Sequence, residues 1–167
     1  MSRYRLQSHS IETMSGFSFD LSRFADDDVC WTYLEEYLWP NGPICPACGS
    51  VGDATRWKPR PHHWQCYYRR RGGKPCGKQF HAAYGTPMQG SHLPKRKWFE
   101  AIFLLSTSPG LSTVALGRRL DVGQKTAWLV ARRLRQNSFL ERDLASDIVA
   151  VVEGRSPTAR SSKKQKR

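Results

Sequence analysis

Cys45-Pro46-Ala47-Cys48-Gly49 begins the segment around which the rest of this 167-residue chain is organised. The two residues between the cysteines allow both thiolates to point into one tetrahedral metal site. Seventeen residues then lead to Cys66, an interval typical of zinc ribbons, and Cys76-Gly77 repeats the Cys-Gly pattern. Four thiolates complete the coordination of zinc and leave no open position for water. The sequence therefore predicts one structural Zn²⁺ ion, bound by Cys45, Cys48, Cys66 and Cys76.

The alternatives to zinc are a redox pair, disulfides or unrelated buried thiols. Residues 1–30 contain no apolar segment of the signal-peptide type, which argues against a disulfide-bonded secreted domain and favours a cytoplasmic protein. His62 or His63 could replace one cysteine as a ligand. Cys30 lies in an amphipathic pattern, so we expect it in the core rather than at the metal.

Positive charge is concentrated at and after the metal ligands. The formal net charge is +13, yet residues 1–53 carry a net −5. Residues 54–99 contain eleven Lys or Arg and no Asp or Glu, and residues 100–167 carry +7. A basic surface with interleaved aromatic residues is typical of nucleic-acid binding, although a merely solvated basic face is the alternative. No run of eighteen apolar residues exists, so we expect no membrane span.

A basic loop separates Cys66 from Cys76 and is predicted to project between the two ligands. Its cations would contact phosphates, and they are Arg69, Arg70, Arg71 and Lys74, with Lys78 just beyond. Trp64, Tyr67 and Tyr68 could also stack on unpaired bases, which keeps RNA open as a partner.

Short elements surround the metal segment. Asp26–Asp28 precede a predicted helix over residues 29–39, with Val29, Tyr33, Leu34 and Leu38 on one face. Antiparallel strands are expected at 54–58, 63–68 and 78–82. A further helix is expected over 95–106, with Ser91 or His92 near its cap and Pro94 in its first turn. It brings two more candidate phosphate contacts, Lys95 and Lys97.

Residues 112–135 have the pattern of a helix-turn-helix. Helices are predicted at 112–120 and 124–135, joined by a turn at 121–123, with small Gly117 where they cross. The inward residues are Ala127, Val130, Ala131 and Leu134. The exposed start of the second helix suits base edges and phosphates through Gln124, Lys125, Thr126 and Trp128, while Arg132, Arg133 and Arg135 would hold flanking backbone. The alternative is a plain helical hairpin with a solvated basic face.

The expected fold class is α+β, in four parts. These are a flexible N-terminus (1–17), a helix plus zinc ribbon (18–90), a helix-turn-helix (91–138), and a short apolar remnant with a disordered basic tail (139–167). Within the last part, the run 147–152 is compatible with a strand that lacks its sheet.

Several motifs in order resemble one protein family. Tyr33-Leu34, Trp39-Pro40-Asn41-Gly42 and Cys45–Ser50 resemble the zinc-ribbon start of DDE-type bacterial insertion-sequence transposases. The similarity continues through Gln79-Phe80, Gly85–Met88 and Lys97-Trp98 into Thr126-Ala127-Trp128, and it covers about residues 18–138. It implies that both modules bind double-stranded DNA at the element's terminal repeats. A following ribonuclease-H-like domain would then cut and join strands with three acidic residues and divalent metal.

The chain departs from this family in two places. The loop between Cys66 and Cys76 is wider than the compact pair expected. The run Val149–Glu153 matches the first catalytic strand, yet Val152 stands where the aspartate would be. The resemblance therefore implies a non-catalytic DNA-binding protein derived from a transposase, acting as a regulator or as a subunit of a mobile-element or defence complex. The alternatives are an active transposase or nuclease component, a zinc-based protein-interaction adaptor, and an RNA binder.

Overall fold

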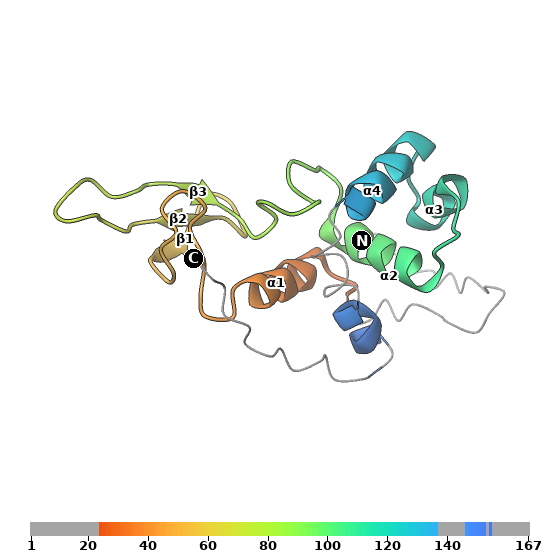
Figure 1. The fold of residues 1–167 in the computed structure, drawn as a ribbon, viewed down its shortest axis with the longest axis horizontal. Helices are drawn as coiled ribbons and strands as arrows, with labels where there is room; N and C mark the ends of the chain where they lie inside the picture. The colour runs from red at the N-terminus through yellow and green to blue at the C-terminus, as the bar shows by residue number, and fades with distance from the viewer. Residues whose placement is uncertain (1–23, 137–145, 153, 155–167) are drawn as a thin grey trace, which may run out of the picture.

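The computed structural model describes residues 24–136, 146–152 and 154. Its elements in order are α1 (Asp27–Leu38), β1 (Ala54–Arg56), β2 (Trp64–Cys66), β3 (Gln79–Phe80), α2 (Lys95–Thr107), α3 (Thr113–Leu120) and α4 (Gln124–Gln136). The small sheet lies toward one end of the long axis, α2, α3 and α4 lie toward the other, and α1 lies between them (Figure 1). The predicted α+β class is confirmed.

The predicted first helix is present, but it begins two residues earlier, at Asp27, and buries a somewhat different face. Asp26 is the N-cap, and its carboxylate accepts a hydrogen bond from the Asp28 N–H at 3.1 Å. The buried face contains Cys30, Leu34 and Tyr37, which confirms Cys30 as a core residue. Val29, predicted on the packed face, is 46% exposed, so that assignment is wrong. The predicted face and the observed buried face both repeat with a 3.6-residue period, so packing against the rest of the protein determines which one is buried.

The sheet is antiparallel in the order β1-β2-β3. Ala54 pairs with Cys66, and Trp64 pairs with Phe80. All three predicted strands are present, and each is shorter than predicted. Such short strands bury little apolar surface, so this part of the chain needs another source of stability.

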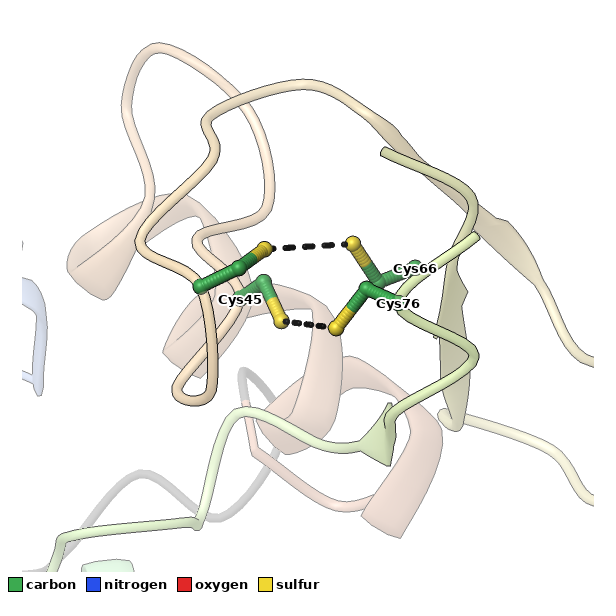
Figure 2. A group of neighbouring side chains, drawn as sticks. Cys45, Cys66 and Cys76 are labelled. Carbon is green, nitrogen blue, oxygen red and sulfur yellow. Dashed lines mark hydrogen bonds between the residues drawn. The ribbon is translucent and has the colours of Figure 1, made fainter. Parts of the chain in front are cut away.

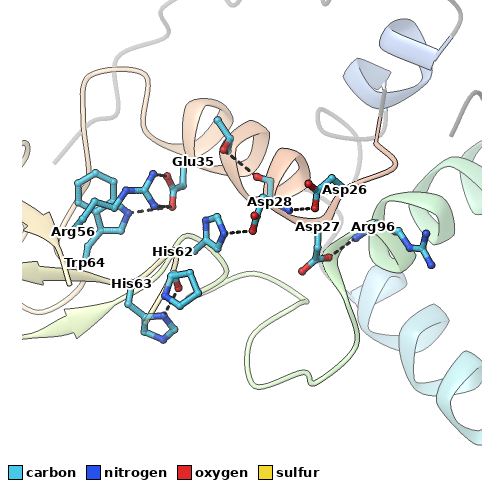
Figure 3. Close-up of polar contacts among 11 residues, drawn as sticks. Asp26, Asp27, Asp28, Glu35, Arg56, His62, His63, Trp64 and Arg96 are labelled. Atoms are coloured by element: carbon cyan, nitrogen blue, oxygen red, sulfur yellow. Dashed lines mark hydrogen bonds and ion pairs between the residues drawn. The ribbon is translucent and has the colours of Figure 1, made fainter. Parts of the chain in front are cut away.

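A buried carboxylate ties α1 to the sheet. Glu35 is only 7% exposed and accepts hydrogen bonds from Arg56 Nη1 at 3.0 Å and from Trp64 Nε1 at 3.1 Å (Figure 3). A second bond joins Arg56 Nη2 to the other carboxylate oxygen at 2.5 Å. The guanidinium also lies over the Trp64 ring, 4.4 Å from its centroid. The bidentate pair therefore fixes α1 against two strands at once.

Glu35→Gln should lower the free energy of unfolding by about 1–2 kcal/mol, because the charge-assisted pair is lost while an acceptor for Trp64 remains. The half-exposed Arg56 keeps the effect at this modest size. The matched control is Glu36→Gln, the exposed neighbouring carboxylate, which should change stability by less than about 0.5 kcal/mol. Urea denaturation at fixed free zinc measures both. Equal effects from the two variants would contradict the role given to Glu35.

Helix α2 forms the centre of the main core. It buries Trp98, Phe99, Ile102 and neighbouring apolar residues in one cluster that also takes in side chains from α1, α3 and α4. Pro94 is its N-cap, and no side chain of its own caps it. Pro94, predicted in the first turn, is thus one residue before it. Ser91, predicted near the cap, accepts hydrogen bonds from the Leu93 N–H at 3.1 Å and the Trp98 indole at 3.2 Å.

Asp27 of α1 supplies the acidic group that the first turn of α2 lacks. Its carboxylate accepts a hydrogen bond from the Arg96 N–H at 3.1 Å (Figure 3). A carboxylate at the positive end of the α2 dipole stabilises that helix and joins it to α1.

Residues 146–152 are helical, so the predicted strand is wrong. Ile148 is fully buried in the main core, and packing on the helical domain overrides the β preference of this valine-rich run. The predictions for residues 1–17, for residues 137–145, for Glu153 and for the tail from 155 onward concern residues outside those that the structure describes. In the described part of the chain, every helix is too short or too polar to cross a bilayer.

Candidate functional site

Two turns present the four predicted ligands. In the first, the Cys45 N–H donates to the Ser50 carbonyl and the Gly49 N–H to the Cys45 carbonyl, both at 2.9 Å. In the second, the Gly77 N–H donates to the Cys66 carbonyl at 3.0 Å. Gly49 and Gly77 have φ of +74° and +65°, a conformation that glycine adopts without steric cost. The glycine after Cys48 and the glycine after Cys76 are therefore explained by the left-handed backbone conformation that each turn requires.

The four sulfur atoms converge on one point. Cys45 Sγ lies 3.8 Å from Cys76 Sγ, and Cys48 Sγ lies 3.6 Å from Cys66 Sγ (Figure 2). All four ligand atoms lie within 4.8 Å of one another. Zn–S bonds of about 2.3 Å in a tetrahedron place sulfurs about 3.8 Å apart, whereas a disulfide needs about 2.0 Å. The cysteines are free thiols with the spacing of a zinc site.

Ser50 is a functional residue that the sequence analysis missed. Its hydroxyl lies 3.3 Å from Cys48 Sγ and 3.4 Å from Cys66 Sγ, where it can donate to a thiolate. This hydrogen bond is the main reason that the pKa of Cys48 falls to about 6. Burial raises the pKa of the Cys45 and Cys66 thiols. Ser50 therefore favours the charged form of the ligand set, and its place two residues after Cys48 was the available signal.

Neither histidine replaces a cysteine. His62 Nε2 lies 2.8 Å from a carboxylate oxygen of Asp28 (Figure 3). The His62 ring also stacks on Trp31, with centroids 5.2 Å apart. His63 Nδ1 lies 3.0 Å from the Pro61 carbonyl. Their loop turns toward α1 and away from the sulfurs, so the alternative ligand assignment is wrong.

Helices α3 and α4 are joined by a three-residue turn and pack closely. Ser112 caps α3 by accepting from the Ala115 N–H at 3.2 Å. A Cβ at Gly117 would lie 3.1 Å from the Val122 carbonyl oxygen and 3.4 Å from Ala127 Cβ. The buried residues of α4 are those predicted from the sequence, namely Ala127, Val130, Ala131 and Leu134. The crossing therefore depends on a residue without a side chain.

The outward side of α4 is polar, basic and aromatic. Gln124, Lys125 and Thr126 are exposed at its start, and Trp128 is 50% exposed one turn later. The Arg132 guanidinium lies over the Trp128 ring, 5.3 Å from the centroid. These predicted contact residues therefore share one accessible surface.

Beside this surface lies a groove, near which the structure places two candidate phosphate-contacting cations that the sequence analysis did not name. It has a volume of about 370 Å³ and is lined by residues of α3, the turn and the start of α4, including Arg118 and Gln124. Arg118 and Arg119 are exposed in the last turn of α3, between buried Leu116 and Leu120. That helical spacing was the signal that could have identified them.

Three predicted contact cations are engaged within the protein. Lys95 is 5% exposed with Nζ 4.4 Å from the centroid of the Trp31 ring, and burial lowers its pKa. Lys97 Nζ donates to the Asp121 carbonyl at 2.9 Å. Arg133 Nη1 donates to the Gln89 carbonyl at 3.1 Å. These side chains join elements of the fold, so we leave them out of the candidate surface.

Comparison with known proteins supports the assignment of the zinc-binding segment. Residues 25–79 match the family model of the transposase zinc-ribbon domain, and this segment contains all four cysteines. The cluster is therefore the site of one structural zinc ion in a zinc-ribbon domain. No curated protein and no solved structure matches the chain. For α2, α3 and α4 the family resemblance stays a prediction.

Proposed function

We propose that this chain is a non-catalytic protein that binds duplex DNA with sequence preference. In this proposal α3 and α4 form a helix-turn-helix, and the zinc ribbon adds a basic surface to it. The observation that carries the proposal is the exposed start of α4, where Gln124, Lys125 and Thr126 project from a helix whose opposite side is fully buried.

The chemistry of this surface suits the major groove. An α-helix fits that groove, and glutamine, lysine and threonine side chains reach base edges and thymine methyl groups. The positive end of the α4 dipole would face DNA, and Arg118 and Arg119 on α3 would reach the flanking phosphates. Arg132 and Trp128 extend the same side of α4 by one turn.

The charge of the ribbon supports the same partner. No acidic residue occurs in residues 54–99, and the exposed cations there suit phosphate contacts without base recognition. The proposed nucleic-acid contacts in this region are Arg69, Arg70, Arg71, Lys74 and Lys78. A transposase zinc-ribbon match over residues 25–79 fits a nucleic-acid partner.

The proposal that the chain binds without cutting rests on its carboxylates. Two-metal strand cleavage needs several carboxylates around one point. Among the described residues, the group able to hold a metal ion consists of the four cysteines. Incubation of labelled duplex with magnesium or manganese should leave it intact. Site-specific cleavage that persists in preparations free of contaminating nucleases would favour the active-transposase alternative instead.

Selection of bound sequences from random duplexes tests the role of α4. The wild-type protein should enrich one motif, and the double variant Lys125→Ala with Thr126→Ala should flatten it, since each good base contact discriminates by about 1–3 kcal/mol. The matched control removes the same residue types from the ribbon, as Thr55→Ala with Lys58→Ala, both exposed. The control should keep the motif. An unchanged motif in the α4 variant would remove α4 from this role.

A further inference from the structure

The segment 67–75, here called the basic finger, is a projecting hairpin. The Cys76 N–H donates to the Tyr68 carbonyl at 2.9 Å, and Arg69 pairs with Pro75 in an antiparallel bridge. Its tip is closed by a 2.9 Å hydrogen bond from the Gly73 N–H to the Arg70 carbonyl. The segment between β2 and β3 extends away from the helices at the far end of the molecule (Figure 1). Every residue of the finger is exposed.

Two tyrosines on this finger lie outside both hydrophobic clusters of the described residues. Tyr67 is 51% and Tyr68 is 38% exposed. Among the described residues, neither ring stacks on another aromatic ring or lies under a cation, and the hydrogen bonds of both residues are made by the backbone. Both residues directly follow β2, at the base of the finger.

The third aromatic residue considered for base stacking is excluded by the structure. Trp64 donates its indole N–H to Glu35, and its ring lies under Arg56 and against Trp39. The ribbon core thus uses Trp64 and leaves both tyrosines free.

Phosphate binding alone would need only the cations of the finger. Exposed tyrosines between cations are instead typical of surfaces that bind unpaired nucleotides, where bases stack on the rings and the cations hold the backbone. Bases inside a duplex are already stacked on each other and cannot lie on these rings. We propose that the basic finger binds an unpaired DNA strand that adjoins the duplex held by α4.

The placement of the two surfaces fits one continuous DNA molecule. The finger and the α3–α4 pair lie at opposite ends of the long axis (Figure 1). A duplex bound at α4 would therefore have to reach along the molecule, past the sheet, before its unpaired end met Tyr67 and Tyr68. This inference rests on the proposed function, because α4 supplies the duplex contact.

Fluorescence anisotropy measures the affinity for two forms of a duplex that carries the selected motif. One form is blunt, and the other has a ten-nucleotide single-stranded overhang. The wild-type protein should bind the overhang form about tenfold tighter or more, given what one stacked base contributes. Tyr67→Ala with Tyr68→Ala should lose this gain and keep the blunt-duplex affinity. Tyr67→Phe with Tyr68→Phe should retain the gain, since stacking needs the ring and not the hydroxyl.

Two further arms separate this inference from the proposed function. Lys125→Ala with Thr126→Ala should weaken the blunt duplex while leaving the ratio between overhang and blunt forms unchanged. If no blunt duplex is bound, the proposed function fails, and a single-stranded oligonucleotide still measures the finger directly. Zinc content confirms that the tyrosine variants stay folded. No gain from the overhang in the wild-type protein, or an equal gain in the alanine variant, would overturn the inference.

Discussion

Cys48→Ser should release the zinc ion and unfold residues 40–85 while α2, α3 and α4 remain folded. The core around the metal has four buried members, Cys45, Ala54, Cys66 and Phe80, and two of these are ligands. So small a core cannot hold three short strands without the metal. Structural zinc contributes about 10 kcal/mol or more to such modules, so metal binding and folding are one equilibrium.

Nuclear magnetic resonance measures this loss by region. Amide signals from residues 40–85 should collapse to random-coil positions. Those of α2, α3 and α4 should persist because, apart from Ala82 and Ala83, the buried residues of their core lie outside this segment. The control is Cys30→Ala, which removes a buried thiol outside the metal cluster. It should keep one zinc ion per chain and cost about 1 kcal/mol of stability. Retained zinc and unchanged ribbon signals in Cys48→Ser would disprove the metal assignment.

Gly117→Val has the second largest expected effect. A Cβ at this position already lies 3.1 Å from a backbone oxygen of the turn, and the two methyl groups of valine would need further room. Overpacking of this kind costs typically 1–3 kcal/mol, and we expect about 3 kcal/mol because backbone must move. The α3–α4 crossing would open, so duplex affinity should fall together with the melting temperature.

The same substitution at Gly110 is the matched control. A Cβ there meets no heavy atom within 4 Å, and its φ lies outside the left-handed region. Gly110→Val should therefore change the free energy of unfolding by less than about 1 kcal/mol. Differential scanning calorimetry of the two zinc-loaded variants makes the comparison. Similar melting temperatures would show that the helices do not depend on the close approach at Gly117.

Local patterns allowed much of the fold to be predicted. The spacing within Cys45–Cys48, the acidic residues at the start of α1 and the buried face of α4 all depend on residues a few positions apart. Each pattern has one low-energy local structure, so little tertiary information is needed. The zinc ion and the boundaries of α3 and α4 followed from this.

Long-range partners could not be predicted from the sequence. Lys95 is a charged residue next to Arg96 in a basic run, yet its ammonium group is buried over Trp31 of a distant helix. Trp64 likewise pairs with Glu35, which lies 29 residues earlier in the chain. The run 147–152 has strong β preference and forms a helix because Ile148 enters the main core. In each case a tertiary contact outweighs the local preference.

The salt dependence of duplex binding tests the central claim most directly, namely that this zinc-held basic chain binds the DNA backbone and positions α4 in a groove. Affinity of the zinc-loaded protein for its selected duplex should fall linearly on logarithmic axes as salt rises. About five phosphate contacts give a slope near −4.5, a loss of roughly 500-fold between 50 and 200 mM salt. Affinity that is undetectable, or that stays constant over this range, would contradict the account and favour a protein-interaction adaptor.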